Sequence, residues 1–427
     1  MRRSGLGFFA SALIVFSAVT ARAETPAVSS GARVAIVGDS ITEQKLYSKY
    51  VEAYLLACSG LKDLEVFQFG WSGERADGFA ARVENDLGIF KPTVVTLCYG
   101  MNDGGYRPWE DSIGKTYETN MRSVLKKLDA LGVKTIVVGS PGAVDQNFFR
   151  PGQKFGNEAA HVAYNDNLAH LRDIDRKLAT ELGQRFANVH DAMYVAMKKA
   201  QDELGPKYDV CGADGFHPGP NGQLIMAYAF LKGLGVDGKI GEITVDMKGE
   251  AKATEGHKVL KSAAGTAELE STRWPFCFDG DAKSSSGTRS ITPFLPFNET
   301  LNRFTLKVAN LEAAKAKVQW GSQTKEFSRE QLAGGINLAA EFTQTPFDAD
   351  FAKFVGALGA KQAFETYMIK QVITGFRGFP QDLKEDAEFT GALKVVSSKL
   401  LKKQKSLDAD ARKLLVPVKH TITVTAL

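Results

Sequence analysis

Residues 33–41 read Arg33-Val-Ala-Ile-Val37-Gly38-Asp39-Ser40-Ile41, an apolar run that stops at Gly-Asp-Ser. The β-branched residues of this run predict a buried strand, and the glycine that follows predicts a tight turn. The turn places Ser40 at the carboxyl end of the strand, where open α/β sheets build their active sites. Ser40 is therefore a candidate nucleophile, although Gly-Asp-Ser after a strand also occurs as a plain turn or a helix N-cap.

A serine hydroxyl needs a general base, and His217 lies in a segment that suits this role. The segment reads Cys211-Gly-Ala-Asp214-Gly-Phe-His217-Pro-Gly-Pro-Asn221. Its glycines and prolines predict a fixed turn, in which Asp214 accepts the Nδ1–H of His217 and Nε2 faces the serine. Metal binding by Asp214 and His217 is the rival interpretation, but no third ligand follows at a recognisable spacing. We expect neither a metal ion nor an organic cofactor.

Two further segments at predicted strand ends can supply oxyanion donors. Gly73 closes the run Phe69-Gly70-Trp71-Ser72-Gly73, where glycines allow the backbone to approach a substrate and the Gly73 N–H to point at it. Asn102 lies in Tyr99-Gly100-Met101-Asn102-Asp103 and offers a side-chain N–H donor. A turn role is the alternative for both, because Gly and Asn are also favoured in turns.

These four blocks, in this order, resemble the SGNH hydrolase superfamily, also called GDSL esterases and lipases. The resemblance covers roughly residues 30–235, and Ile41 replaces the leucine of Gly-Asp-Ser-Leu. It implies that Ser40 is the nucleophile, His217 the general base and Asp214 the orienting carboxylate. It further implies an oxyanion hole made by the backbone N–H of Ser40 together with Gly73 and Asn102. The implied fold is a three-layer α/β/α sandwich of flavodoxin-like type with a parallel sheet.

The residues between the blocks predict the same fold class independently. Strands are predicted at 33–37, 64–68, 93–98, 133–139 and 187–191, and helices at 43–59, 77–87, 116–131 and 161–183. Alternating strands and helices indicate a parallel sheet with helices on both faces. His161, His170 and His190 lie in these elements, and we expect them to be surface or packed side chains rather than ligands.

Beyond Gly238 the pattern changes to short alternating runs. They predict antiparallel strands at 242–247, 257–261, 266–272, 303–308 and 316–320, with a long loop at 276–298. From about 330 to 415 the pattern is helical, and 420–426 alternates as a closing strand. The expected organisation is a hydrolase domain over 24–238 and a C-terminal β-sandwich-like domain over 239–427 that carries a helical segment at about 330–415.

The N-terminus and the composition indicate the compartment. Arg2-Arg3, an apolar stretch from Leu6 to Val19 and Ala21-Arg22-Ala23 predict a signal peptide over 1–23, with a retained N-terminal anchor as the alternative. The mature chain is then secreted or periplasmic, without stable membrane insertion. A formal net charge of +4 gives no sign of a nucleic-acid partner. The cysteines are Cys58, Cys98, Cys211 and Cys277; export permits disulfides, but their spacing fixes no pairing.

The expected function is that of an exported serine ester hydrolase that works through an acyl-enzyme. Export and the added β-rich region favour removal of O-acetyl groups from carbohydrate, so the expected partner is a small ester or an acylated glycan. A lipid esterase of lysophospholipase type is one alternative. A non-catalytic glycan-binding protein on the same scaffold is another, although the intact Ser40, His217 and Asp214 argue against it.

Overall fold

A parallel sheet of five strands forms the centre of the N-terminal half of the computed structural model, which describes residues 26–427. The strand order is β2-β1-β3-β4-β7, and all neighbours are parallel. The strands are β1 (Arg33–Gly38), β2 (Glu65–Gly70), β3 (Val94–Cys98), β4 (Thr135–Gly139) and β7 (Arg185–Ala187). The apolar run at 33–37 is therefore a buried central strand, as predicted, because helices cover both faces of the sheet. The predicted signal peptide at 1–23 lies outside the described residues.

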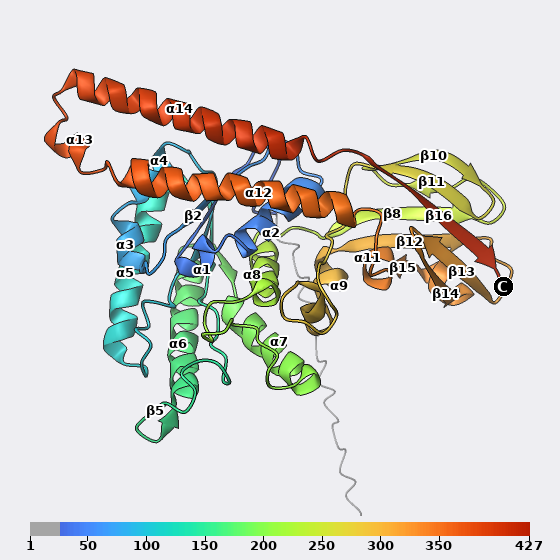
Figure 1. The fold of residues 1–427 in the computed structure, drawn as a ribbon, viewed down its shortest axis with the longest axis horizontal. Helices are drawn as coiled ribbons and strands as arrows, with labels where there is room; N and C mark the ends of the chain where they lie inside the picture. Colours follow the sequence, from blue (N-terminus) through green and yellow to red (C-terminus); the bar gives the residue numbers. More distant parts are fainter. Residues whose placement is uncertain (1–25) are drawn as a thin grey trace, which may run out of the picture.

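Helices flank this sheet in two layers (Figure 1). One layer holds α5 (Asp111–Ala130) and α6 (Ala160–Glu181), which pack together, and α3 (Ala76–Ala80) and α4 (Val83–Gly88) pack on α5. The other holds α2 (Tyr47–Ala53) and α8 (Pro220–Gly233), with α7 (Val189–Leu204) beside α8. The three-layer α/β/α class is confirmed. A short hairpin, β5 (Lys154–Phe155) and β6 (Glu158–Ala159), precedes α6.

Two predicted elements differ in detail from the structure. The helix expected at 43–59 is divided into α1 (Ser40–Glu43), α2 and the π-helix η1 (Tyr54–Cys58), because Lys45 takes a left-handed φ of 59° between α1 and α2. The strand expected at 187–191 ends at Ala187. Asn188 then caps α7, since its side chain accepts the N–H of Asp191, and this places His190 in the first helical turn.

The C-terminal half contains two β-sheets that pack face to face. One sheet has the order β10-β11-β16-β13-β14 and the other β15-β12-β8-β9. The strands are β8 (Lys239–Asp246), β9 (Lys252–Ala253), β10 (His257–Ala263), β11 (Thr266–Ser271), β12 (Arg303–Ala309), β13 (Lys315–Trp320), β14 (Gln323–Ser328), β15 (Ile336–Asn337) and β16 (Val418–Ala426). Phe304 of one sheet contacts Trp320 of the other edge to face, with ring centroids 5.8 Å apart. The expected antiparallel arrangement is wrong at one place, because β8 and β12 pair in parallel.

Short helices connect the strands of this β-rich region. The predicted loop at 276–298 contains η2 (Arg289–Phe294) and the start of α9 (Phe297–Leu301). α10 (Arg329–Gly334) and α11 (Leu338–Glu341) flank β15. The capping box of Ser328 and Gln331 begins α10.

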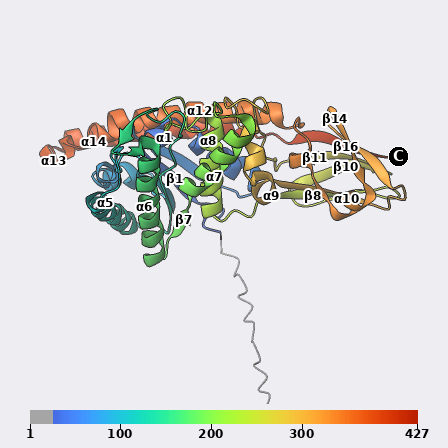
Figure 2. The same ribbon diagram turned by 90° about the horizontal axis from the view of Figure 1, so that it is seen from below.

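A helical insertion separates β15 from β16 and returns to the α/β half. It comprises α12 (Asp348–Met368), the π-helix η3 (Ile369–Thr374), α13 (Phe379–Asp382) and α14 (Ala387–Arg412). α12 and α14 run side by side across the α/β half, and β16 then enters the sandwich (Figures 1 and 2). The predicted sandwich with a helical insertion is thus observed. However, α12 packs on α2 and β2, and α14 packs on α12, rather than on the sandwich.

The insertion covers the open edge of the parallel sheet. Because β2 is an edge strand, its outward backbone groups have no strand partner. Lys361 of α12 donates to the carbonyl of Val66 at 2.6 Å, and Glu365, one turn later, accepts the N–H of Gln68 at 3.1 Å. Side chains of α12 therefore satisfy backbone groups that another strand would otherwise bond.

Two remaining sequence expectations concern cysteines and membrane helices. None of the four cysteines forms a disulfide, and Cys98 packs as a buried thiol in β3. Within residues 26–427, none of the helices combines the length and the apolar character that a membrane crossing requires.

Candidate active site

Ser40, His217 and Asp214 form a continuous hydrogen-bonded chain at the carboxyl end of the sheet. Ser40 is the first residue of α1 and follows β1 directly, where Asp39 caps the helix by accepting the N–H of Ile41. The Oγ of Ser40 lies 2.8 Å from Nε2 of His217, and Nδ1 of His217 lies 2.7 Å from Oδ2 of Asp214. Segments 177 residues apart thus meet in the geometry that the sequence predicts for a nucleophile, a base and an orienting carboxylate.

A tight turn holds the histidine and its carboxylate together. Oδ1 of Asp214 accepts the backbone N–H groups of Phe216 and His217, at 3.1 and 3.0 Å. Gly215 has a φ of 82°, and a Cβ there would lie 2.2 Å from the backbone nitrogen of Phe149, so only glycine fits. Burial opposes ionisation of Asp214, but the hydrogen bonds from His217 and Phe216 outweigh it, and the pKa of Asp214 is lowered. Asp214 is therefore an anion beside the imidazole.

Gly73 and Asn102 lie in the loops that follow β2 and β3, the two strands that flank β1. Gly73 has a φ of 73° and open space where a Cβ would be. Nδ2 of Asn102 donates to the carbonyl of Glu74 at 3.0 Å and makes a long contact of 3.4 Å with Oδ2 of Asp39. One N–H of the Asn102 amide is thus held by Glu74, and the other faces the turn of Ser40 with only a weak acceptor.

Tyr106 fixes the orientation of the Asn102 amide, and the sequence analysis does not identify it. Its hydroxyl donates to Oδ1 of Asn102 at 2.9 Å, which leaves the amide nitrogen on the side of Asp39. Tyr106 has a left-handed φ of 55°, unusual for an aromatic residue. Its ring packs against Phe216, whose own ring centroid lies 4.4 Å from that of His217. Gly104-Gly105 before Tyr106 is typical of a turn, but a turn pattern does not reveal this contact.

Two aspartates, the buried Asp39 and the partly exposed Asp103, support the turns around the site. Asp103 accepts the N–H groups of Ala76 and Gly100, both at 3.0 Å, and so ties the loop after β3 to the start of α3. Burial raises the pKa of Asp39 to about 7 and that of Asp103 to about 6. Each carboxyl thus takes up a proton in the folded protein at a pH where an exposed aspartate is ionised.

The helical insertion also reaches the site. Lys370 of η3 contacts both carboxylate oxygens of Glu43, the last residue of α1, at 2.9 and 3.0 Å. Glu43 also accepts the backbone N–H of Ser72, which precedes Gly73. Lys370 therefore links the helix of Ser40 to the loop of Gly73. Its position 327 residues away from Glu43 explains why local sequence patterns could not reveal this role.

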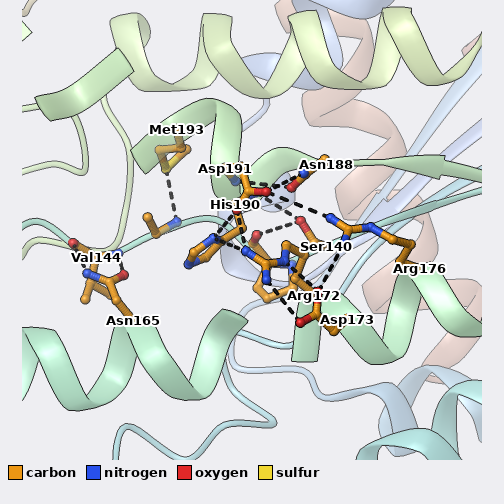
Figure 3. A network of polar contacts seen from close by, with 12 residues as sticks. Ser140, Val144, Asn165, Arg172, Asp173, Arg176, Asn188, His190, Asp191 and Met193 are labelled. Carbon is orange, nitrogen blue, oxygen red and sulfur yellow. Dashed lines mark hydrogen bonds and ion pairs between the residues drawn. The ribbon is translucent and has the colours of Figure 1, made fainter. Parts of the chain in front are cut away.

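A second polar cluster, around His190, lies apart from Ser40 between β4, α6 and α7 (Figure 3). Nδ1 of His190 is 3.0 Å from Asp191, and Arg172 pairs with the same carboxylate. The backbone N–H of His190, not its ring, bonds the hydroxyl of Ser140, at 3.0 Å. His190 is buried and its pKa is lowered, with burial as the largest cause. This cluster joins helices and has no serine hydroxyl on its imidazole, so His190 is a packed histidine, as expected.

The other two histidines of the α/β half, His161 and His170, agree with this division of roles. His170 is exposed and stacks on Trp109, with ring centroids 4.4 Å apart, while His161 is partly exposed at the start of α6. Across residues 26–427, His, Cys, Asp and Glu side chains do not gather in groups of three or more that could hold a metal.

Comparisons with known proteins show which family the sequence of the α/β half resembles. Residues 36–225 match the model of the GDSL-like Lipase/Acylhydrolase family. An acetylxylan esterase of Geobacillus stearothermophilus is 25% identical over 232 residues, which are 49% of this chain and 97% of that protein. The family match includes the segments of Ser40, Gly73, Asn102 and His217.

One solved structure resembles the whole chain. It is described as a gut microbial diltiazem-metabolizing enzyme, and it matches with a TM-score of 0.70 and 22% identity over 94% of this chain and 98% of that one. At this identity the likeness concerns the fold, and it includes the β-rich region and its insertion. The predicted family and enzyme class are confirmed: residues 36–225 form a GDSL-like acylhydrolase domain, and the protein is a carboxylic ester hydrolase.

Proposed function

We propose that the protein is an exported serine esterase that removes O-acetyl groups from carbohydrate. The observation that carries the proposal is the chain of contacts from Ser40 Oγ to His217 Nε2 and from His217 Nδ1 to Asp214, at 2.8 and 2.7 Å. In this arrangement the imidazole can accept the hydroxyl proton while the carboxylate holds its tautomer and stabilises the imidazolium.

The mechanism has two displacement steps. Ser40 Oγ attacks the ester carbonyl carbon as its proton passes to Nε2 of His217, and a tetrahedral oxyanion forms. His217 then gives this proton to the leaving alcohol oxygen, the C–O bond breaks, and the acyl group remains on Ser40. Water, deprotonated by His217, attacks the acyl-enzyme and releases the carboxylic acid and the free serine.

Three N–H groups are proposed to bind the oxyanion: the backbone N–H groups of Ser40 and Gly73 and the side-chain amide of Asn102. Ser40 is at the start of α1, where a helix leaves its first N–H groups without partners. Asn102 has its oxygen held by Tyr106, so its nitrogen is directed before the reaction begins. Donors oriented in advance need no reorganisation as the charge develops, which is the source of their catalytic effect.

Two observations support this substrate class: the name of a related protein and the residue types around Gly73. The relative that is 25% identical is named for acetylxylan, an acetylated polysaccharide. A cavity of about 370 Å³ beside Gly73 has mainly polar and charged walls, including Arg75, Asp77 and Thr374. Such walls suit a hydroxyl-rich alcohol better than a long acyl chain. Export is part of the proposal on the ground of the signal-like sequence at 1–23.

The test compares variants and acyl-chain lengths on one purified protein. Ser40→Ala and His217→Ala should each abolish hydrolysis of p-nitrophenyl acetate, whereas the control Ser112→Ala, at an exposed serine of α5, should match the wild type. The wild type should prefer acetate to octanoate and should release acetate from acetylated xylan. Activity retained by Ser40→Ala would contradict the nucleophile, and a preference for octanoate would favour a lipid esterase.

A further inference from the structure

The cavity beside Gly73 has walls from two distant parts of the chain. One wall is formed by the loop of residues 71–78 and by Arg82. The other is formed by Thr374, the last residue of the π-helix η3 of the insertion, and by Arg377, which follows it. Gly73 itself lines this cavity, and its N–H is a proposed oxyanion donor. A group bound in the cavity is therefore adjacent to the reacting ester.

Hydrogen bonds to α4 and to α1 hold the wall that comes from the insertion in place. Thr374 donates to Oδ2 of the buried Asp86 at 2.7 Å, and Asn85 donates to the carbonyl of Ile373 at 2.9 Å. Lys370 adds its two contacts with Glu43. Arg377 follows this anchored segment, and its backbone N–H bonds the carbonyl of Thr374 at 3.1 Å. The position of Arg377 relative to Gly73 is thus set by the fold.

The three arginines that line the cavity differ in how closely carboxylates pair with them. Arg82 is buried between Glu74 and Asp86, at 2.6 and 2.8 Å, so two carboxylates face its single charge. Arg75 makes one contact of 3.2 Å with Asp77, and both of these side chains are about half exposed. Arg377 is exposed and makes no ion pair with any carboxylate in the part of the chain that the structure describes. The cavity therefore has one unpaired guanidinium and a second that is only loosely paired.

The acidic groups on and beside the cavity walls have cationic partners other than Arg377: Glu74 bonds Arg82, and Asp77 makes its one contact with Arg75. Glu43 is bonded by Lys370 and by the N–H of Ser72, and its pKa is lowered because these bonds outweigh its burial. Trp71, on the same wall, has Lys370 at 4.8 Å and Arg82 at 5.0 Å from its ring centroid. Because two cations already lie over this ring, the cavity offers charge and hydrogen-bond donors more than an open aromatic platform for a neutral sugar.

We infer that this cavity is a subsite for a carboxylate carried by the alcohol part of the ester, as in an acetylated sugar next to or bearing a uronic acid group. The inference rests on the proposed function and names its substrate class more narrowly. Guanidinium groups bind carboxylates through paired, charge-assisted hydrogen bonds, and Arg377 and Arg75 present two such groups on opposite walls. The insertion thus contributes a specificity residue to the hydrolase domain.

The test uses a matched pair of small substrates, an O-acetylated alkyl glucuronoside and the corresponding glucoside, which differ only in carboxylate against hydroxymethyl. We expect kcat/KM to be about fivefold to tenfold higher for the glucuronoside at low ionic strength, mainly through KM, as one or two charge-assisted bonds imply. Arg377→Gln should bring the two values close together, and so should about 0.5 M salt, because screening weakens an exposed charge pair.

Controls separate the subsite from the esterase itself. Arg176→Gln removes an exposed arginine of α6 that pairs with Asp173 far from the cavity, and it should keep the wild-type ratio. Hydrolysis of p-nitrophenyl acetate should be unchanged in Arg377→Gln. Equal kcat/KM for the two sugars, with normal p-nitrophenyl acetate activity, would overturn the subsite alone. Absence of activity on every ester would overturn the proposed function, and the subsite with it.

Discussion

Replacing Lys361 with methionine is expected to lower the free energy of unfolding by about 3–5 kcal/mol, the usual cost of leaving buried carboxylates without their cation. Nζ of Lys361 contacts Glu52 at 2.7 Å, Glu365 at 2.9 Å and the carbonyl of Val66 at 2.6 Å. All three charged side chains are fully buried. The nearby carboxylates hold the pKa of Lys361 above its usual range although burial opposes this, so the lysine is charged.

The assay is equilibrium unfolding in urea, followed by both fluorescence and circular dichroism. Lys353→Met is the matched control on the same helix, because Lys353 is exposed and pairs with Asp350 at 3.1 Å. An exposed pair of this kind contributes at most about 1 kcal/mol. A variant that replaces Lys361 with Met and both glutamates with Gln should recover much of the loss, since it buries no unpaired charge.

The pH dependence of the Lys361→Met variant provides an independent check. Burial raises the pKa of Glu365 to about 7 even with Lys361 present, and it also raises the pKa of Glu52. Without Lys361, Glu365 and Glu52 in the folded state bind protons at a pH where the same groups of the unfolded chain have already lost them. This proton binding stabilises the folded state more in the variant than in the wild type. The variant should therefore become more stable relative to the wild type as pH falls from 8 to 5. A loss below about 1 kcal/mol at pH 8, equal to that of Lys353→Met, would refute the assigned role of this buried cluster.

Other perturbations test the site and the division of the chain. Asn102→Ala should lower kcat by about 10²–10³ with KM and melting temperature little changed; a role in the turn alone predicts a lower melting temperature with normal kcat. Tyr106→Phe loses one hydrogen bond to Asn102 and should lower kcat by up to about tenfold in the same assay; wild-type kcat would contradict the orienting role. Because burial raises the pKa of Asp39 from 3.8 to about 7, this group makes the folded protein less stable as pH rises across that range; Asp39→Asn should make the fall of melting temperature with pH less steep, while Asp103 and Glu365 keep their share of it. A chain ended at Gly238 should be recovered only as aggregate, because it lacks α12; a soluble, active product would show that the edge of β2 needs no cover.

The sequence alone determined the local features of the catalytic half. Apolar runs that end at glycine predicted the parallel strands, because a strand buried on both faces needs consecutive apolar side chains. The Gly-Asp-Ser turn and the Asp-Gly-Phe-His turn each contain, within four residues, the groups that orient them. For this reason Ser40, Asp214 and His217 could be predicted before the structure placed them together. The breaks at Lys45 and Asn188 were missed, since a single backbone angle or cap leaves little trace in a periodic pattern.

Only the tertiary structure decided what the insertion does. The helices at 348–412 follow the β-rich region in sequence, and their pattern predicts helices without showing which surface they cover. Their place is decided by groups from both halves of the chain: the unpaired backbone of edge strand β2, the buried Glu52 of α2, and Lys361, which bonds both. The same holds for Lys370 beside Glu43 and for Tyr106 beside Asn102. These contacts depend on burial and on distance in space, and neither quantity is present in a linear pattern of residue types.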